Sequence, residues 1–549
     1  MSARVAKQRK RRILFNWDGS DVLAFLKDAP TPEKYLEWSF QSIDGSQVDT
    51  LLYCFGGGNT AEYVSDVLEL PGAADHFKFQ SDDVRYRSEN ARKLAEMGAN
   101  PPEIISMAAH KRGLEVFFSL RMNDTHDNGL DSEYPTFKRE HPEWLVPQLR
   151  DNLVNIQAPG EPRPCATTLN FAVREVRELK LAIIREVFEK WDFDGIELDW
   201  SRHGSHFIPG TEYANRHFLT EYTREVRKIA ADGAKRLGHP VYVFARVPET
   251  LHGCTVGGYD VAQWFKEDLV DGLILGDMVL NTPHLSQFRD LMVSKSVALY
   301  PSVYGYGMGY PLWDDATIRG VAANLWAAGA DGLATYNLYP KGAFRRKVLQ
   351  QIGSAETLKG EDKRYLSPRN VLTSYTRFSR HNCPASPLPA FLNMVGMDAR
   401  LDYIPHTIWA DVEVADDIPT LASEGKVDKI ELTVGLKDLL DDDRLFISIN
   451  GHSLTEPWKD IVAPHVRIIT WDLNADDVRG SQPGGGEEAT HHEYPGVRFD
   501  VPPEWLRAGT NTVQVLLLPT ERRGSPYGPA QCPSVFVTRV ELLTTFRKQ

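Results

Sequence analysis

The chain has 549 residues, a hydrophobic content of 42%, a charged content of 25% and a formal net charge of −13. This length exceeds one ordinary core, so we expect two or three domains of the soluble globular class that the composition indicates. The acidic balance argues against a nucleic-acid binder, and no apolar run is long enough to predict a membrane span. Five scattered cysteines form neither a disulfide framework nor a CxxC metal motif.

The first twelve residues form a basic tail that ends in KQRKRR at residues 7–12. We expect a solvated tail, with anion binding or targeting as the alternative. No apolar segment of a secretory signal precedes Ile13, which predicts a cytoplasmic protein. Removal of a signal peptide would instead indicate a secreted or periplasmic one.

Between residues 13 and 352, short apolar runs alternate with segments of helical periodicity. The predicted strands are 13–17, 48–55, 114–120, 193–199, 240–247, 271–276, 297–303 and 331–336. The predicted helices are 31–43, 83–97, 101–112, 171–190, 213–236, 259–265, 316–328 and 344–352. Eight successive βα units predict a parallel (β/α)8 barrel, the TIM-barrel fold of the α/β class, over residues 13–370.

A weak internal repeat supports the barrel, because the second, fourth, sixth and eighth predicted strands begin with Asp49, Asp194, Asp271 and Asp331. The third and fifth residues after that Asp should point into the barrel. These are Ile274 and Gly276 in the sixth strand, and Ala334 and Tyr336 in the eighth. The fourth strand instead places Glu197 and Asp199 there, where acids are costly unless they are paired or used in chemistry.

After about residue 370 the sequence changes character, with a polar linker over 371–390 and short strands with turn signals over 391–549. The predicted strands are 407–414, 429–434, 445–449, 467–471, 497–501, 512–518 and 534–543. This pattern predicts a C-terminal β-sandwich. We favour packing on the barrel over glycan binding, since no aromatic platform is evident. His491 and His492, in a predicted loop over 479–495, have no spaced partners for a metal.

In a barrel of this kind, the active site lies at the carboxyl ends of the strands. Asp199 is the candidate nucleophile or general base, and Glu249, just past the fifth strand, is the candidate general acid. Asp277 and Asp124 are the alternates for the second carboxylate. Glu197 is either a buried acid paired with Arg121 or Arg246 or a direct participant.

Carboxylates beside flat aromatic rings suit sugars, whose C–H faces pack on rings while their hydroxyls bond to acids and amides. Aromatic residues also alternate with Gly in the loop 302–313. The candidate substrate-binding residues are Trp17, Asp18, Arg121, Asn123, Asp124, Glu197, Trp200, Arg202, Arg246, Tyr304, Tyr336 and Asn337. No GxGxxG, P-loop, GxSxG or HExxH motif indicates another chemistry, and we expect no cofactor and no metal.

Several of these motifs resemble a known family. They are Asn170-Phe171, Glu175-Val176-Arg177, the strand-four run from Asp192 to Asp199 with Arg202, and His141-Pro142-Glu143-Trp144. Together, over roughly residues 13–349, they resemble the glycosyl-hydrolase-like family ten, which implies a (β/α)8 sugar hydrolase. The C-terminal part is similar to the accessory β-sandwiches attached to such barrels, with residues 506–512 similar to a galactose-binding-like turn and strand.

The fourth strand is also similar to that of chitinase-type hydrolases. Asp194, Glu197 and Asp199 match the acids of that motif, but Ser201 stands where the catalytic Glu belongs. This departure argues against substrate-assisted chitinase chemistry.

The residues and the resemblance together predict hydrolysis of a glycosidic bond in an oligo- or polysaccharide by two carboxylates. The arginines near Asp199 would favour uronic or sulfated sugars. One alternative is a carbohydrate-binding barrel without catalysis. The other is a metal-dependent barrel lyase or isomerase that uses Glu197, Asp199 and Asp277.

Overall fold

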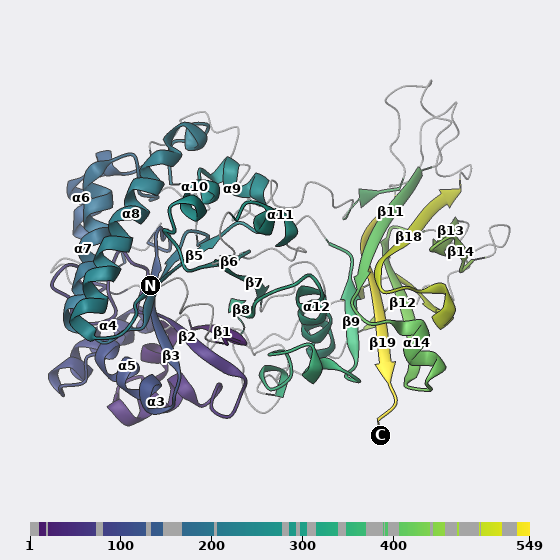
Figure 1. Ribbon diagram of the computed structural model, residues 1–549, viewed down its shortest axis with the longest axis horizontal. Helices are drawn as coiled ribbons and strands as arrows, with labels where there is room; N and C mark the ends of the chain where they lie inside the picture. Colours follow the sequence, from purple (N-terminus) through teal and green to yellow (C-terminus); the bar gives the residue numbers. More distant parts are fainter. Residues whose placement is uncertain are drawn as a thin grey trace.

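The N-terminal part of the computed structural model is a closed barrel of eight parallel strands (Figure 1). In order around the barrel these are β1 (Ile13–Trp17), β2 (Val48–Cys54), β3 (Glu115–Arg121), β4 (Gly195–Asp199), β5 (Tyr242–Val247), β6 (Gly272–Leu275), β7 (Ala298–Tyr304) and β8 (Leu333–Tyr336). Pairing of β8 with β1 closes the barrel. The predicted α/β barrel and its eight strands are confirmed.

The structure describes residues 10–17, 20–72, 79, 81–127, 133–146, 167–202, 206–276, 285–292, 297–304, 314–336, 338, 347–368, 388, 390–392, 406–439, 443–455, 469–470, 493–494, 496–518 and 535–548. Within these ranges, no helix is long and apolar enough to cross a membrane.

The helices that the sequence predicts are found as α3 (Pro32–Phe40), α4 (Asp82–Glu96), α5 (Pro101–Lys111), α7 (Arg174–Lys190), α8 (Glu212–Leu237), α10 (Val261–Lys266) and α12 (Asp315–Ala327). Residues 347–349 of the predicted closing helix are also helical. The structure adds α2 (Ser20–Phe25), α9 (Leu251–Gly257) and α11 (Leu285–Asp290). It also adds α6 (Thr136–Glu140) and the 3-10 turn η1 (Pro142–Trp144) in the long connection after β3.

The Asp repeat is a structural device at the amino end of the barrel. Each Asp lies at or near the start of an even-numbered strand and accepts a hydrogen bond from a backbone N–H at or near the start of the preceding odd-numbered strand. These bonds run from Arg12 N to Asp49 (2.7 Å), from Val116 N to Asp194 (2.9 Å), from Val243 N to Asp271 (2.8 Å) and from Leu299 N to Asp331 (2.8 Å). Each Asp also contacts a basic side chain, from Arg12, His110, Arg227 and Arg289 respectively. The repeat therefore fastens neighbouring strands in pairs.

The barrel interior consists of an apolar layer between two buried ion pairs. At the amino end, Arg11 binds Glu115 through two bonds of 2.6 and 2.7 Å, and both side chains are fully buried. At the carboxyl end, Arg246 binds Glu197. The apolar layer between them comprises Leu14, Leu52, Phe117, Tyr242, Phe244, Ile274, Ala298, Tyr300 and Ala334. Ile274 and Ala334 thus point inward, as the strand alternation predicts.

The C-terminal part contains antiparallel sheets. One has the order β10 (Ala390–Phe391), β19 (Phe536–Phe546), β12 (Val427–Lys437) and β17 (Gly496–Asp500), with β9 (Lys363–Leu366) also on β19. The other has the order β11 (His406–Val414), β18 (Gly509–Leu518), β13 (Arg444–Ile449) and β14 (His452–Ser453). Two short strands, β15 (Ile469–Thr470) and β16 (Glu493–Tyr494), pair separately, and α14 (Ile418–Ser423) follows β11. Each predicted strand has a counterpart, while the face-to-face packing of a β-sandwich stays a prediction.

The C-terminal sheets join the barrel through α12, which lies between them in Figure 1. Gly320 of α12 approaches β9 so closely that a Cβ atom there would lie 2.1 Å from the Arg364 carbonyl oxygen. Arg364 also contacts Glu541 on β19 and Asp314 at the start of α12, each at 3.4 Å. β9, which precedes the predicted linker in sequence, therefore belongs to the C-terminal sheet.

Candidate active site

Asp199 ends β4 at the carboxyl end of the barrel and is only 2% exposed. Its Oδ1 accepts hydrogen bonds from the backbone N–H groups of Ser201 (3.0 Å) and Arg202 (3.1 Å). Its Oδ2 lies 3.5 Å from the Tyr336 hydroxyl, which donates to it from β8. These donors stabilise a negative charge on the carboxylate and fix its orientation.

Beneath Asp199, the fully buried side chain of Glu197 binds Arg246. The Arg246 Nε and Nη2 atoms both lie 2.8 Å from Glu197 Oε1, and Nε lies 3.8 Å from Asp199 Oδ1. Burial disfavours the charge on Arg246, but Glu197 and Asp199 outweigh it and raise the pKa of the guanidinium. The sequence allows Glu197 to be either a buried, paired acid or a direct participant, and its full burial against Arg246 favours the buried, paired acid over the predicted contact with substrate.

Arg246 also contacts the strands β7 and β8. Its Nη1 donates to Ser302 Oγ on β7 (3.0 Å), whose hydroxyl donates to the Gly276 carbonyl beyond β6 (3.2 Å). Its guanidinium carbon lies 4.4 Å from the centre of the Tyr336 ring on β8. One buried arginine therefore connects the carboxyl ends of β4 to β8.

Glu249 lies two residues beyond β5, directly before Thr250, whose side chain caps α9. Its carboxylate leans over the end of β6, where a Cβ atom on Gly276 would lie 3.0 Å from Glu249 Oε2. Gly276 has a φ of +99°, which also favours glycine at this position. The loop thus places Glu249, also 2% exposed, at the same barrel end as Asp199.

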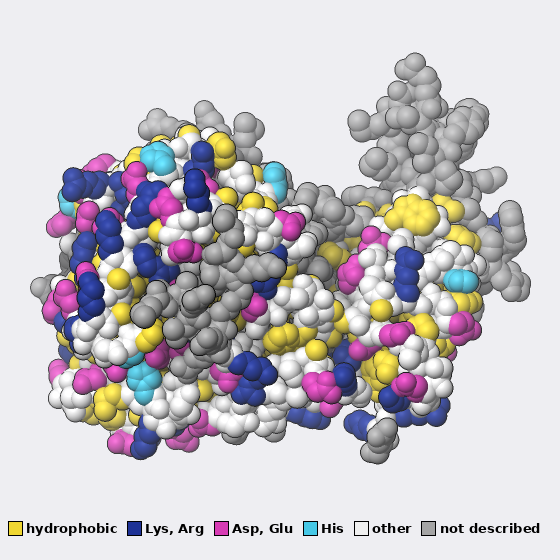
Figure 2. All heavy atoms as spheres, in the orientation of Figure 1, with side chains coloured by type: hydrophobic (Ala, Val, Ile, Leu, Met, Phe, Trp, Pro, Cys, Tyr) yellow, Lys and Arg dark blue, Asp and Glu magenta, His cyan; other side chains and the backbone are white. Residues whose placement is uncertain are grey.

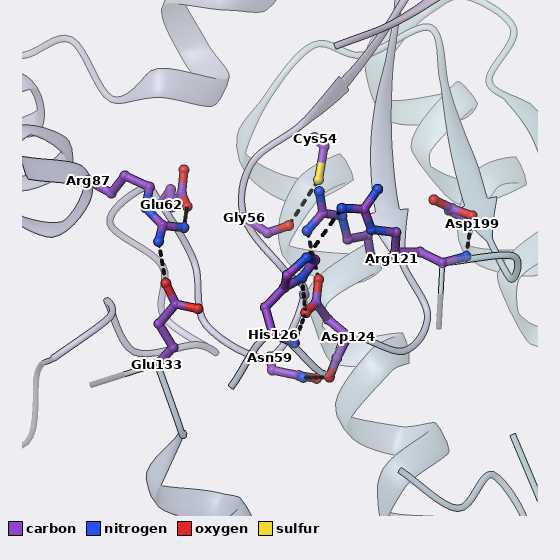
Figure 3. A network of polar contacts seen from close by, with 12 residues as sticks. Cys54, Gly56, Asn59, Glu62, Arg87, Arg121, Asp124, His126, Glu133 and Asp199 are labelled. Carbon is purple, nitrogen blue, oxygen red and sulfur yellow. Dashed lines mark hydrogen bonds and ion pairs between the residues drawn. The ribbon is translucent and has the colours of Figure 1, made fainter. Parts of the chain in front are cut away.

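A chain of polar contacts, shown in part in Figure 3, runs from β3 to β8. Arg121 Nη1 donates to Asp124 Oδ2, and Asp124 Oδ1 lies 2.7 Å from His126 Nδ1. Arg202 bridges His126 Nε2 (3.3 Å) and the Tyr336 hydroxyl (3.2 Å). His126 was not among the predicted residues, although its position two residues after Asp124 beyond a strand end was a usable signal.

Asn123 and Trp200, both predicted to bind substrate, have packing roles instead. The Asn123 side-chain amide donates to the Leu169 carbonyl, accepts from the Leu169 N–H and also bonds to His206 Nδ1. The Trp200 ring is fully buried against Phe171, His206, Tyr222 and Tyr259 on the helix side of β4. Because Asp199 faces inward, strand alternation turns Trp200 outward, and its indole presents no surface to a sugar.

His206 connects these two residues. Burial lowers its pKa to about 4, so the imidazole is neutral near pH 7. The neutral ring donates from Nε2 to the Trp200 carbonyl (3.0 Å) and accepts at Nδ1 from Asn123 (3.0 Å). His206 therefore holds the turn after β4 against the loop after β3.

The long connection after β3 is anchored by buried charges that the sequence did not reveal. Lys138 on α6 and Thr167 both bond to Asp127, and Lys138 is fully buried. Lys180 on α7 donates to the Gly58 carbonyl, and burial lowers its pKa to about 7. Arg87 on α4 binds both Glu62, which follows β2, and Glu133 in the connection (Figure 3).

The remaining predicted residues are placed only in part. Trp17 ends β1 with 7% exposure and stacks on Phe15. Tyr304 ends β7, but its side chain is not described, and Asp18, Asp277 and Asn337 lie outside the described residues. Within the described ranges, no group of three or more His, Cys, Asp or Glu side chains is arranged to hold a metal ion.

No protein-family model and no curated protein sequence matches this chain. Several solved structures are similar. The PgaB (BpsB) glycoside hydrolase domain of Bordetella bronchiseptica aligns at 14% identity and a TM-score of 0.38, covering 63% of this chain and 99% of that one. Alpha-L-fucosidase isoenzyme 2 of Paenibacillus thiaminolyticus aligns at 16% identity and a TM-score of 0.37, covering 63% and 48%.

The GH36 alpha-galactosidase AgaB of Geobacillus stearothermophilus aligns at 11% identity and a TM-score of 0.33, covering 93% of this chain and 56% of that one. The matches thus span about half of the fucosidase and galactosidase chains. At these identities and TM-scores the similarities carry no inference about activity, which rests below on the site itself.

Proposed function

We propose that this protein is a glycoside hydrolase in which Asp199 and Glu249 form the catalytic pair. The observation that carries the proposal is that Asp199 ends β4 and Glu249 follows the adjacent strand β5, so both carboxylates lie at the same end of the barrel, with the buried Arg246–Glu197 ion pair beneath Asp199. Active sites of such barrels lie at this end. Most glycoside hydrolases use two carboxylic acid side chains that flank the glycosidic bond.

In this mechanism the two acids have different roles. Asp199, which accepts three hydrogen bonds and lies near Arg246, is the charged partner that attacks the anomeric carbon or activates a water molecule. Glu249 donates a proton to the leaving oxygen. A carboxyl separation of about 5–5.5 Å would give retention of configuration, and one of about 6.5–9.5 Å would give inversion.

The described contacts favour a neutral glycan over the uronic or sulfated sugar that the sequence indicates. The three predicted substrate-binding arginines are Arg121, Arg202 and Arg246. Two of them already form ion pairs with acids of the protein, Arg121 with Asp124 and Arg246 with Glu197. An anionic substituent would have to compete with these carboxylates. The metal-dependent lyase or isomerase is disfavoured by the same reasoning, because the Arg246 guanidinium occupies the position between Glu197 and Asp199.

The test is a screen for hydrolysis of neutral and anionic oligosaccharides by the wild type and by Asp199→Asn. We expect hydrolysis of at least one glycan by the wild type and a loss of kcat of at least about a hundredfold in Asp199→Asn, without a large change in melting temperature. The matched control, Asp232→Asn, changes an exposed acid on α8 and should keep full activity. A binding-only barrel would bind glycans without turnover, and full activity in Asp199→Asn would refute the assignment.

A further inference from the structure

The outer face of the sheet β11-β18-β13 carries an exposed tryptophan. Along β11, Ile408, Ala410 and Val412 are buried in the core, whereas Trp409 points away from it and is 55% exposed. Figure 2 shows hydrophobic side chains gathered on the surface over β11 and β18. A large exposed aromatic on a rigid sheet indicates a contact surface.

The strand register determines which side chains surround Trp409. One row across the sheet holds Trp409, Gln514 and Ser448, and the adjacent rows hold Thr407, Leu516 and Phe446 on one side and Asp411 and Thr512 on the other. These rows, which we call the Trp409 face, combine an indole with an amide, threonine hydroxyls, one carboxylate and the apolar side chains of Leu516 and Phe446, while Ser448 is buried beneath them. They contain no basic side chain.

Hydrogen bonds fix the polar groups of this face. Gln514 Nε2 donates to Thr407 Oγ1 (3.2 Å), and the Ser448 hydroxyl donates to Gln514 Oε1 (3.5 Å). Thr512 donates to Asp411 Oδ1 (2.7 Å). Gln514 lies beside Trp409 in the same row, and Asp411 lies in the next row, so an amide and a carboxylate neighbour the indole. This is the arrangement that a sugar needs, with its C–H face on the ring and its hydroxyls on fixed polar groups.

The size of the Trp409 face favours a small ligand over a protein partner. With strands about 4.8 Å apart and about 3.4 Å per residue along each strand, the rows cover roughly 10 by 14 Å. A stable protein interface buries about 800 Å² on each partner, several times this area. The carboxylate of Asp411, without a basic neighbour in the rows, disfavours an anionic chain.

We propose that the Trp409 face is a binding site for a neutral glycan chain, separate from the barrel. The proposal revises the expectation that the C-terminal part lacks an aromatic platform. It holds whether or not the barrel hydrolyses glycans, because no residue of the barrel contributes to the face.

The test is electrophoresis of the full-length protein in gels that contain xylan, laminarin, galactomannan or polygalacturonate. We expect a neutral polysaccharide to retard the wild type, and Trp409→Ala to weaken this binding about tenfold. Trp409→Phe should restore part of it. Tyr213→Ala, which removes an exposed aromatic from α8, is the matched control and should bind like the wild type.

Equal retardation of Trp409→Ala and the wild type would overturn the proposal, since another site would then account for binding. Absence of retardation in all four gels would also overturn it, as would retardation by polygalacturonate alone. A dimer in sedimentation experiments that Trp409→Ala abolishes would assign the face to a second copy of the chain instead. Melting temperatures of the variants show whether each change leaves the fold intact.

Discussion

Asp199 and Glu197 are two residues apart on one strand, and depth alone separates their roles. Glu197 is buried beneath the site and binds Arg246. Asp199, at the strand end, accepts hydrogen bonds from two backbone N–H groups of the following turn and from the Tyr336 hydroxyl on β8. A buried charge without a partner is unfavourable by several kcal/mol. Arg246 therefore stabilises the fold by balancing the charge of Glu197. This contribution can be measured as a free energy of unfolding, separately from catalysis.

Arg246→Met should lower the free energy of unfolding by about 3–5 kcal/mol, because it leaves Glu197 buried without its partner. The double variant Glu197→Met/Arg246→Met removes both charges and should recover a large part of this loss. Urea unfolding of the three proteins at pH 7 measures the effect. A single variant as stable as the double variant would show that the ion pair does not balance the burial of Glu197.

His206 predicts an acid-sensitive stability. Its folded pKa of about 4 lies below the ordinary value of 6.5, so the unfolded chain binds more protons between these values. Stability should therefore be complete above about pH 6.5 and fall on acidification towards pH 4, by up to about 3 kcal/mol from this group. His206→Gln should reduce the pH slope of urea unfolding between pH 4.5 and 7. An unchanged slope would contradict the role of His206.

At the scale of elements, α12 is where the barrel and the C-terminal sheets meet. Its closeness to β9 depends on the absence of a side chain at Gly320, and Arg364 fastens β9 to both β19 and the start of α12. α12 follows the aromatic loop after β7 in sequence. The C-terminal sheets thus pack against the helix that follows β7 of the barrel.

Gly320→Ala should destabilise the protein by about 1–3 kcal/mol or more, because the added methyl group meets the backbone of β9. The gain in helix propensity from Ala, about 1 kcal/mol, works in the opposite direction. Ala327→Val, an exposed change on the same helix, is the control. Calorimetry should show one unfolding transition in the wild type and a lower or divided transition in Gly320→Ala. A variant as stable as the wild type would refute the close docking.

At the scale of the whole molecule, local pattern was sufficient for the barrel. The eight strands and most helices follow from apolar periodicity, and the Asp repeat marks a real feature of the amino end. β9 was missed because the burial of Lys363 and Arg364 depends on ion pairs with Asp416, Glu541 and Asp314, which lie far from β9 in the sequence. No local pattern contains such pairings.

The site was also predictable only where a local pattern determines it. Alternation along β4 separates the inward Asp199 from the outward Trp200, so the packing role of Trp200 followed from a rule already in use. The choice of Arg246 rather than Arg121 as the partner of Glu197 depends on how the side chains pack inside the barrel. His206 holds two loops together through the Asn123 side chain, which is distant in sequence, and the Trp200 carbonyl, and no local pattern of side chains reveals these contacts.

The most direct test of the central claim compares two substrates with Glu249→Gln. If Glu249 protonates the leaving oxygen, the variant should lose at least about a hundredfold in kcat/KM on an unactivated disaccharide. It should lose much less on the corresponding 2,4-dinitrophenyl glycoside, whose leaving group needs no proton. Equal losses on both substrates, or no loss on either, would contradict the assignment of Asp199 and Glu249 as the catalytic pair.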